Sequence, residues 1–277
     1  RSFPDTTDRI RVFNDQLATW SMSDAQFRFA ATHYAGCQKV TREAARRLRS
    51  HSPGFLVLHY RLGQALGLRG SDESCRPTGE PIRIIVGNDW VDEWPGDRAV
   101  QESWFFHYRG SRVYNCPDAH FIMELNDAGW RGYWSAQVLA QMRANENDGL
   151  FADSYSIPNY FGPENFRPHL PDVDASFEAQ WARRQHAFTD YIQGRFQGRY
   201  KWIPNLGALI NSRDPSDYSN VDGAMVENFA EWGDGNYFDP ADWELQMNRT
   251  LALTRAGKIV IAQSYPNARN VSERLFV

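Results

Sequence analysis

Short apolar runs alternate with longer amphipathic segments along most of this 277-residue chain. Runs rich in β-branched, leucine and aromatic side chains predict strands, and apolar positions at helical spacing between them predict helices. The predicted strands are 10–14, 36–40, 54–58, 149–153, 200–205, 223–227 and 258–263. The predicted helices are 23–33, a segment from Thr41 onward, 129–145, 176–196 and 240–256. Strands that alternate with helices in this way indicate an α/β fold with a parallel sheet.

Residues 61–122 interrupt the alternation with Gly and Pro punctuation, a strand-like run at 82–86 and an aromatic tract at 104–108. Insertions in barrel enzymes commonly lie over the catalytic face, so we expect this segment there. The fold predicted is a (β/α)8 TIM barrel, formed as a single domain by residues 1–277. Seven barrel strands are predicted before the chain stops at Val277. Either the last βα unit is missing or on another polypeptide, or 82–86 is itself a barrel strand.

Two segments repeat one pattern, an Asp-Gly turn, a short apolar strand and then a carboxylate, at 148–153 and 222–227. A carboxylate at the end of a buried strand is costly unless the strand opens into a solvated cleft. Barrel strands all end at one face, and glycoside cleavage needs two carboxyl groups there. We therefore predict Asp153 as nucleophile and Glu227 as acid/base. The alternative is that these acids pair with arginines or cap helices.

Further side chains are predicted to bind substrate. Polar groups follow the strands, and tryptophans lie in polar loops, where a flat ring suits the apolar face of a sugar. The predicted binding residues are His59, Asp89, Trp90, His107, Asn205, Trp232 and Gln263. The alternative for each ring is that it packs a loop onto the barrel, and His59 is equally compatible with a structural role.

The composition of the chain argues against several classes of binding partner. A formal net charge of −4 and a pI near 6.0 give no broad attraction to phosphate backbones, so nucleic acid is not expected. No apolar run approaches the roughly 20 residues of a membrane helix. Zinc, P-loop, dinucleotide and nucleophile-elbow motifs are missing from the sequence, so no cofactor and no metal is predicted. The expected partner is a carbohydrate substrate.

Cys75 and Cys116 lie in polar connecting sequence, where they either form a disulfide or remain free, because spacing alone does not establish the geometry. The chain begins at Arg1 rather than Met, which is compatible with a removed leader. Glycosylation triplets at Asn248 and Asn270 are also compatible with secretion. We therefore expect a secreted or extracytoplasmic protein.

The segments 123–130, 148–153 and 222–227 resemble the hypothetical glycosyl hydrolase family 15. The resemblance runs along most of the chain and implies a barrel related to α-galactosidase-like and dextranase-like glycosidases. It also implies a nucleophile on the fourth strand and a proton donor on the sixth, which here are Asp153 and Glu227. The expected function is hydrolysis of a polysaccharide or oligosaccharide, with a retaining mechanism preferred. The alternatives are an inactive carbohydrate-binding barrel and, less well supported, a metal-dependent amidohydrolase.

Overall fold

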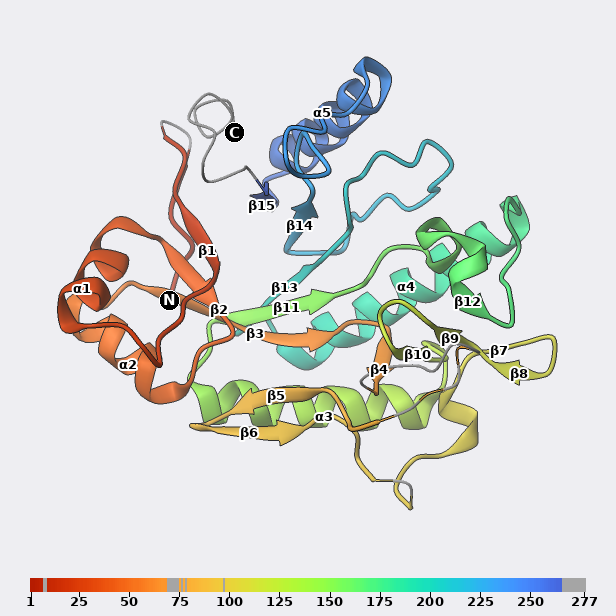
Figure 1. Ribbon diagram of the computed structural model, residues 1–277, viewed down its shortest axis with the longest axis horizontal. Helices are drawn as coiled ribbons and strands as arrows, with labels where there is room; N and C mark the ends of the chain where they lie inside the picture. Colours follow the sequence, from red (N-terminus) through yellow and green to blue (C-terminus); the bar gives the residue numbers. More distant parts are fainter. Residues whose placement is uncertain (7–8, 69–74, 76, 78, 97, 266–277) are drawn as a thin grey trace.

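The computed structural model describes residues 1–6, 9–68, 75, 77, 79–96 and 98–265. Its centre is a set of parallel strands that follow one another in chain order (Figure 1). They are β1 (Phe13–Gln16), β2 (Gly36–Gln38), β3 (Leu56–Leu62), β11 (Gly149–Asp153), β13 (Lys201–Pro204), β14 (Gly223–Glu227) and β15 (Ile259–Gln263). The first five form one sheet, the last two form a pair, and a parallel bridge between Asn205 and Met225 joins the two groups.

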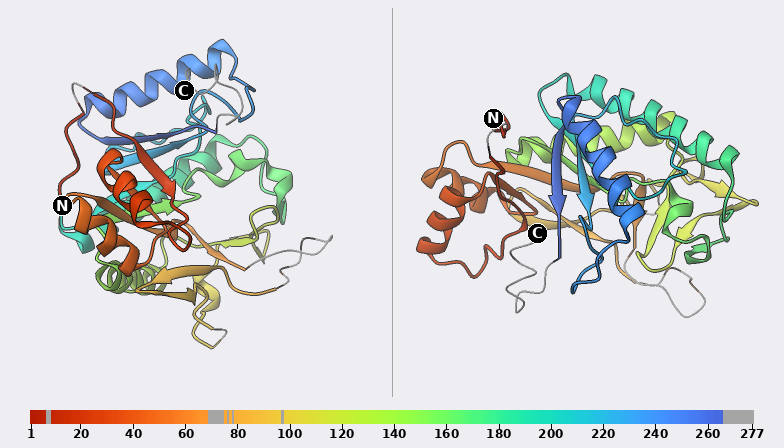
Figure 2. Two further views of the ribbon diagram at one scale, coloured as in Figure 1. Left: turned by 60° about the vertical axis from the view of Figure 1, so that its left-hand side comes forward. Right: turned by 90° about the horizontal axis from the view of Figure 1, so that it is seen from above.

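Five helices connect these strands and pack on the outside of the sheet (Figure 2). They are α1 (Asp24–His33), α2 (Arg42–His51), α3 (Ala128–Asn145), α4 (Ala175–Phe196) and α5 (Pro240–Arg255). Each begins where a Ser, Thr or Asp side chain accepts a backbone N–H of the first turn, which satisfies a donor that the helix itself cannot. The predicted α/β fold with a parallel sheet is confirmed.

A closed barrel of eight strands is not observed. Seven parallel strands are present in the described ranges, and within them no ladder joins β15 to β1. The run at 82–86 is not a barrel strand: β5 (Arg83–Val86) pairs antiparallel with β6 (Asp89–Asp92). Gly87, at a φ of +65°, makes the tight turn between them, a conformation that glycine adopts without steric cost.

Side chains on the two faces of the parallel strands form two different parts of the core. Leu58, Phe151, Ile203 and Met225 meet on the inner face, where Phe13 and Tyr60 pack against them. On the outer face, Trp202 of β13 packs against aromatic residues of the covering helices, among them Trp134 of α3, and Trp181 of α4 belongs to the same core cluster; all three are fully buried. Because successive strand residues point to opposite faces, this division fixes which strand-end residues can reach the interior of the ring.

The insertion after β3 forms mostly short antiparallel strands. They include β4 (Ala65–Gly67), β7 (His107–Tyr108), β8 (Ser111–Arg112), β9 (Tyr114–Asn115) and β10 (His120–Ile122), with a 3-10 turn at Glu102–Trp104. Strand β12 (Phe166–Arg167) completes the sheet β12-β9-β10-β4, which follows directly on the C-terminal end of β3 (Figure 1). The β5–β6 hairpin lies instead beside α3.

Cys75 and Cys116 form a disulfide within this insertion, with their Cα atoms 5.3 Å apart. Cys37 is free and buried in β2. The bridge answers the question that spacing alone left open, because the antiparallel pairing of β4 with β10 brings two distant parts of the insertion together. The assignment of residues 1–277 to a single domain remains a prediction.

Candidate active site

Asp153 and Glu227 are the last residues of β11 and β14, and Asn205 directly follows β13, the strand between them. The side-chain nitrogen of Asn205 donates to Asp153 Oδ1 at 2.8 Å and to Glu227 Oε2 at 2.5 Å. Since both bonds start from one nitrogen, the two acceptor oxygens are separated by no more than about 5 Å. The structure therefore brings the two predicted acids together, with the predicted Asn205 between them.

Asp153 accepts three hydrogen bonds. Besides Asn205, the backbone N–H of Ser154 donates to Oδ1 at 2.8 Å, and the hydroxyl of Tyr60 donates to Oδ2 at 2.7 Å. Burial and the neighbouring Asp153 raise the pKa of Tyr60 well above its ordinary value, so this hydroxyl stays protonated and able to donate. The three donors hold both oxygens of the Asp153 carboxyl group in fixed positions.

Glu227 accepts two hydrogen bonds, both from side chains. The Tyr265 hydroxyl donates to Oε1 at 2.6 Å, and Asn205 donates to Oε2. Burial first, and then the hydrogen bond to Glu227, raise the pKa of Tyr265 above its ordinary value. Among the described residues, Glu227 thus has one donor fewer than Asp153 and no backbone donor.

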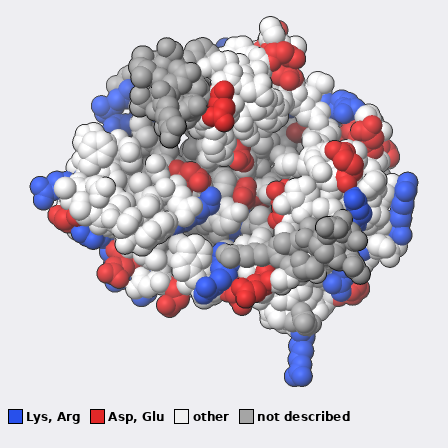
Figure 3. Space-filling model, viewed as in Figure 1, with Lys and Arg blue, Asp and Glu red and all other residues white. Residues whose placement is uncertain are grey.

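Both acids open into a cleft of about 940 Å³. One wall is the segment 206–214 after β13, and aromatic side chains of Tyr160, Phe161 and Trp232 line other parts. Asp118 of the insertion also lines the cleft, with its carboxylate held 2.9 Å from Asn115 Nδ2. Figure 3 shows a central hollow on this face of the molecule, in which acidic side chains gather. This main cleft is the candidate active site.

The position of His59 corrects the sequence-based expectation that it ends a strand at the cleft. Strand β3 continues to Leu62, so His59 lies within the strand, on its outer face, and is buried. Its Nε2 lies 3.0 Å from Gln141 Oε1 on α3, and burial lowers its pKa to about 3. His59 is therefore a neutral, hydrogen-bonded side chain away from the two acids.

Tyr60, the next residue, and Tyr265 are the two tyrosines at the acids that the sequence analysis did not predict as site residues. Strand register pairs Phe151 with Tyr60 and Asp153 with Leu62, so Tyr60 shares the inner face with the catalytic candidate. A period-two count back from a correct strand end would have found it. Tyr265 lies beyond the end of β15, and its sequence position carried no comparable signal.

The remaining predicted residues divide between several places. Trp232 lines the main cleft, and Gln263 ends β15 in register with Glu227. Asp89 and Trp90 belong to the β5–β6 hairpin, outside the main cleft, and Trp90 lines a second cavity together with Tyr60. His107 is on β7, where its Nε2 lies 2.8 Å from Glu102 Oε1, and it lines neither cavity.

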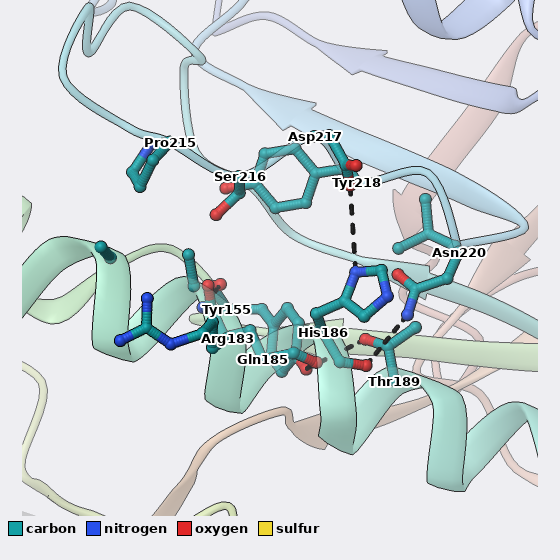
Figure 4. A pocket seen from close by; sticks show the side chains of 13 residues that line it. Tyr155, Arg183, Gln185, His186, Thr189, Pro215, Ser216, Asp217, Tyr218 and Asn220 are labelled. Carbon is teal, nitrogen blue, oxygen red and sulfur yellow. Dashed lines mark hydrogen bonds and ion pairs between the residues drawn. The ribbon is translucent and has the colours of Figure 1, made fainter.

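Another cavity, of about 280 Å³, lies between α4 and the segment that leads into β14 (Figure 4). His186 of α4 faces Asp217 across it, with 3.9 Å between Nδ1 and Oδ1. Neither Asp153 nor Glu227 lines this cavity, so it is separate from the candidate active site.

Within the described ranges, no three His, Cys, Asp or Glu side chains are grouped as metal ligands would be. No helix in the same ranges combines the length and the apolar character needed to cross a membrane.

Comparison with known proteins gives a family and a fold. The family profile described as Hypothetical glycosyl hydrolase family 15 matches residues 86–276, and no curated protein matches. The solved structure of a Paenibacillus sp. cycloisomaltooligosaccharide glucanotransferase, complexed with cycloisomaltoheptaose, aligns with a TM-score of 0.52 at 10% identity, over 91% of this chain and 38% of that chain. At this identity the likeness concerns the fold alone.

A GH36 α-galactosidase from Geobacillus stearothermophilus, AgaA A355E in complex with 1-deoxygalactonojirimycin, aligns with a TM-score of 0.47 at 8% identity, over 98% of this chain and 40% of that chain. A score at this level carries no argument. The chain spans about two fifths of the length of either solved protein. Because the profile covers more than half of the chain and includes both strand-end acids, the chain belongs to the hypothetical glycosyl hydrolase family 15.

Proposed function

We propose that this protein is a glycoside hydrolase that cleaves O-glycosidic bonds in a polysaccharide or oligosaccharide, with Asp153 and Glu227 as its two carboxyl groups. One observation carries the proposal: a single amide nitrogen of Asn205 bonds to both acids at the C-terminal ends of parallel strands. Active sites of barrel enzymes are built at that face, and glycoside cleavage requires two carboxyl groups around one bond.

The short distance between the acids supports a retaining mechanism, for which carboxyl groups about 5 Å apart are typical, whereas inversion needs room for a water between them. Asp153, with three donors, attacks the anomeric carbon and forms a glycosyl ester as the bond to the leaving oxygen breaks. Glu227 gives its proton to that oxygen. It then takes a proton from water, whose oxygen displaces Asp153 from the sugar.

The substrate proposed is a carbohydrate of more than one ring. A cleft of about 940 Å³ lies at the upper end of the range for ligand sites, and its three aromatic side chains offer flat apolar faces to sugar rings. The neighbouring loop supplies hydroxyl and amide groups of Asn211 and Ser212 for the sugar hydroxyls. These features suit the degradation of a polysaccharide.

The test is a hydrolysis screen that measures new reducing ends. Dextran, starch and galactomannan serve as neutral polymers, and polygalacturonate, alginate and dextran sulfate as acidic ones. We expect the wild type to cleave one of them and Asp153→Asn and Glu227→Gln to lose at least a thousandfold in rate. Asp242→Asn, which removes an acid that lines the same cleft without contacting Asn205, is the control and should retain most activity.

Retention is checked separately by NMR of the anomer that is released first. Cleavage with inversion would refute the proposed role of Asp153 as nucleophile. Full turnover by either acid variant would refute the pair. Binding of a glycan without any cleavage by the wild type would favour the carbohydrate-binding barrel instead.

We also propose that the protein works outside the cytoplasm. The Cys75–Cys116 disulfide supports this, because such bonds persist mainly in oxidising compartments. Thiol titration of the native protein from each cell fraction tests it: recovery in the cytosol with all three cysteines reduced would refute the proposal.

A further inference from the structure

A second cavity, the side pocket, lies between the end of β2 and the β5–β6 hairpin. Its volume is about 210 Å³, which corresponds to about seven water molecules and so to roughly one sugar ring. Its lining includes Gln16, Lys39, Tyr60, Arg83 and Trp90. The first three belong to the first three parallel strands or directly follow them, and the last two belong to the hairpin that the insertion adds, so the pocket lies where the sheet and the hairpin meet.

The side pocket is one side chain away from the proposed nucleophile. Tyr60 lines it, while the hydroxyl of the same residue donates to Asp153 Oδ2 at 2.7 Å. The ammonium group of Lys39 lies 4.7 Å from the centre of the Tyr60 ring. A glycan bound across Asp153 therefore has its next ring within reach of this pocket.

Trp90 gives the side pocket a surface that suits a sugar. Its side chain is 45% exposed although it is a large hydrophobic residue. Cross-strand pairing with Ile85 fixes its position, and Arg83 donates from Nη2 to its carbonyl oxygen at 2.5 Å. An anchored, exposed indole beside a cation can stack on the apolar face of a sugar ring while its substituents meet the charged group.

The charges of the two cavities are opposite. Among the described residues that line the side pocket, the charged ones are Lys39 and Arg83, both basic. His59 also lines it, but burial lowers its pKa to about 3, so it stays neutral. The main cleft is acidic by comparison, lined by five carboxylates, Asp118, Asp153, Asp214, Glu227 and Asp242, and by two arginines, Arg213 and Arg249.

The two bases have partners that leave them able to bind an anion. Arg83 lies 3.8 Å from Asp92, and both side chains are about half exposed. An exposed ion pair of this kind contributes little free energy in water, so Asp92 competes only weakly with a bound anion. Lys39 contacts Asp15 at 3.2 Å and keeps a further ammonium proton for another acceptor. Neither Asp15 nor Asp92 lines the pocket.

We propose that the side pocket binds a sugar ring that carries an acidic group, adjacent to the ring cleaved at Asp153. The inference rests on the proposed glycosidase function and deepens it, because it makes the substrate an acidic glycan. Trp90 stacks on the ring, and Arg83 and Lys39 bind its carboxylate or sulfate.

The experiment follows the pocket directly by ¹⁹F NMR of protein labelled with 5-fluorotryptophan, in which the Trp90 signal is assigned by its loss in Trp90→Phe. Hexasaccharides of galacturonate and mannuronate are the carboxylate probes, sulfated dextran fragments are the sulfate probe, and isomaltohexaose is the neutral probe. Arg83→Gln is compared with Arg143→Gln, which removes an exposed arginine of α3 that does not line the pocket.

We expect at least one acidic probe to shift the Trp90 signal, Arg83→Gln to weaken that binding about tenfold, and Arg143→Gln to leave it unchanged. The carboxylate and sulfate arms then identify the acidic group. The proposal is overturned if isomaltohexaose shifts Trp90 as strongly, if no acidic probe shifts it, or if Arg83→Gln binds as tightly as the wild type. The Asp153→Asn variant separates the two proposals. If it hydrolyses glycans as fast as the wild type, the catalytic pair is refuted, while the shift of the Trp90 signal in the same variant still tests the pocket.

Discussion

Asn205→Ala is the substitution that perturbs the candidate active site most directly. It removes the one group that donates to both Asp153 and Glu227, and it leaves two carboxylates facing each other with no donor between them. Asn205 is buried, with 4% of its surface exposed, so water does not simply replace the lost amide. The variant should therefore be less stable than the wild type.

The magnitude follows from the two hydrogen bonds that are lost. Each hydrogen bond to a charged group contributes about 1.5 to 3 kcal/mol, and solvent screening at this half-buried site reduces both contributions. We expect a loss of about 3 kcal/mol in the free energy of unfolding at pH 8.

Urea unfolding followed by tryptophan fluorescence measures this loss. Asn159→Ala is the matched control, because Asn159 is equally buried and its side chain donates to a single carboxylate, Glu178, at 3.2 Å. Its loss should be about half as large, since one hydrogen bond to a carboxylate is removed instead of two. A loss for Asn205→Ala that is no greater than the loss for Asn159→Ala would refute the proposed double hydrogen bond.

Two further predictions concern stability. Asp148→Ala should destabilise the protein by about 3 to 5 kcal/mol, because the buried Arg49, 2.8 Å from Asp148, loses its charge partner. Thermal unfolding measures this, with Asp92→Ala as the control because Asp92 pairs with Arg83 at the exposed surface. The melting temperature should fall much further for Asp148→Ala than for Asp92→Ala. The raised pKa of Tyr60 stabilises the fold below pH 10, and this stabilisation is lost as the pH rises through the folded-state pKa, because the unfolded tyrosine ionises first. Above pH 10 the wild type should therefore lose about 1.4 kcal/mol per pH unit more than Tyr60→Phe in urea unfolding, and equal slopes would contradict this.

The local pattern of the chain predicts most of its helices and parallel strands. The predicted helix at 176–196 and strand at 223–227 match α4 and β14 closely, because periodicity and the residues that cap helices act over a few neighbours. The same local pattern located Asp153 and Glu227, since an acid that ends a buried strand stands out in any register.

Such local patterns do not specify strand register or long-range packing. His59 was preferred to Tyr60 because the predicted end of β3 fell short, and an error in a strand end exchanges the inner and outer faces. The run at 82–86 has the composition of a barrel strand, yet the Gly87 turn directs it into a hairpin.

The sequence by itself determined the alternation of strands and helices, the two strand-end acids and the family to which they belong. Only the tertiary structure decided that one amide joins those acids, that Tyr60 and Tyr265 hold their outer oxygens, and that the insertion creates a basic pocket beside them. The reason is physical: capping and periodicity depend on nearby residues, whereas these hydrogen bonds join residues up to 93 positions apart in the chain.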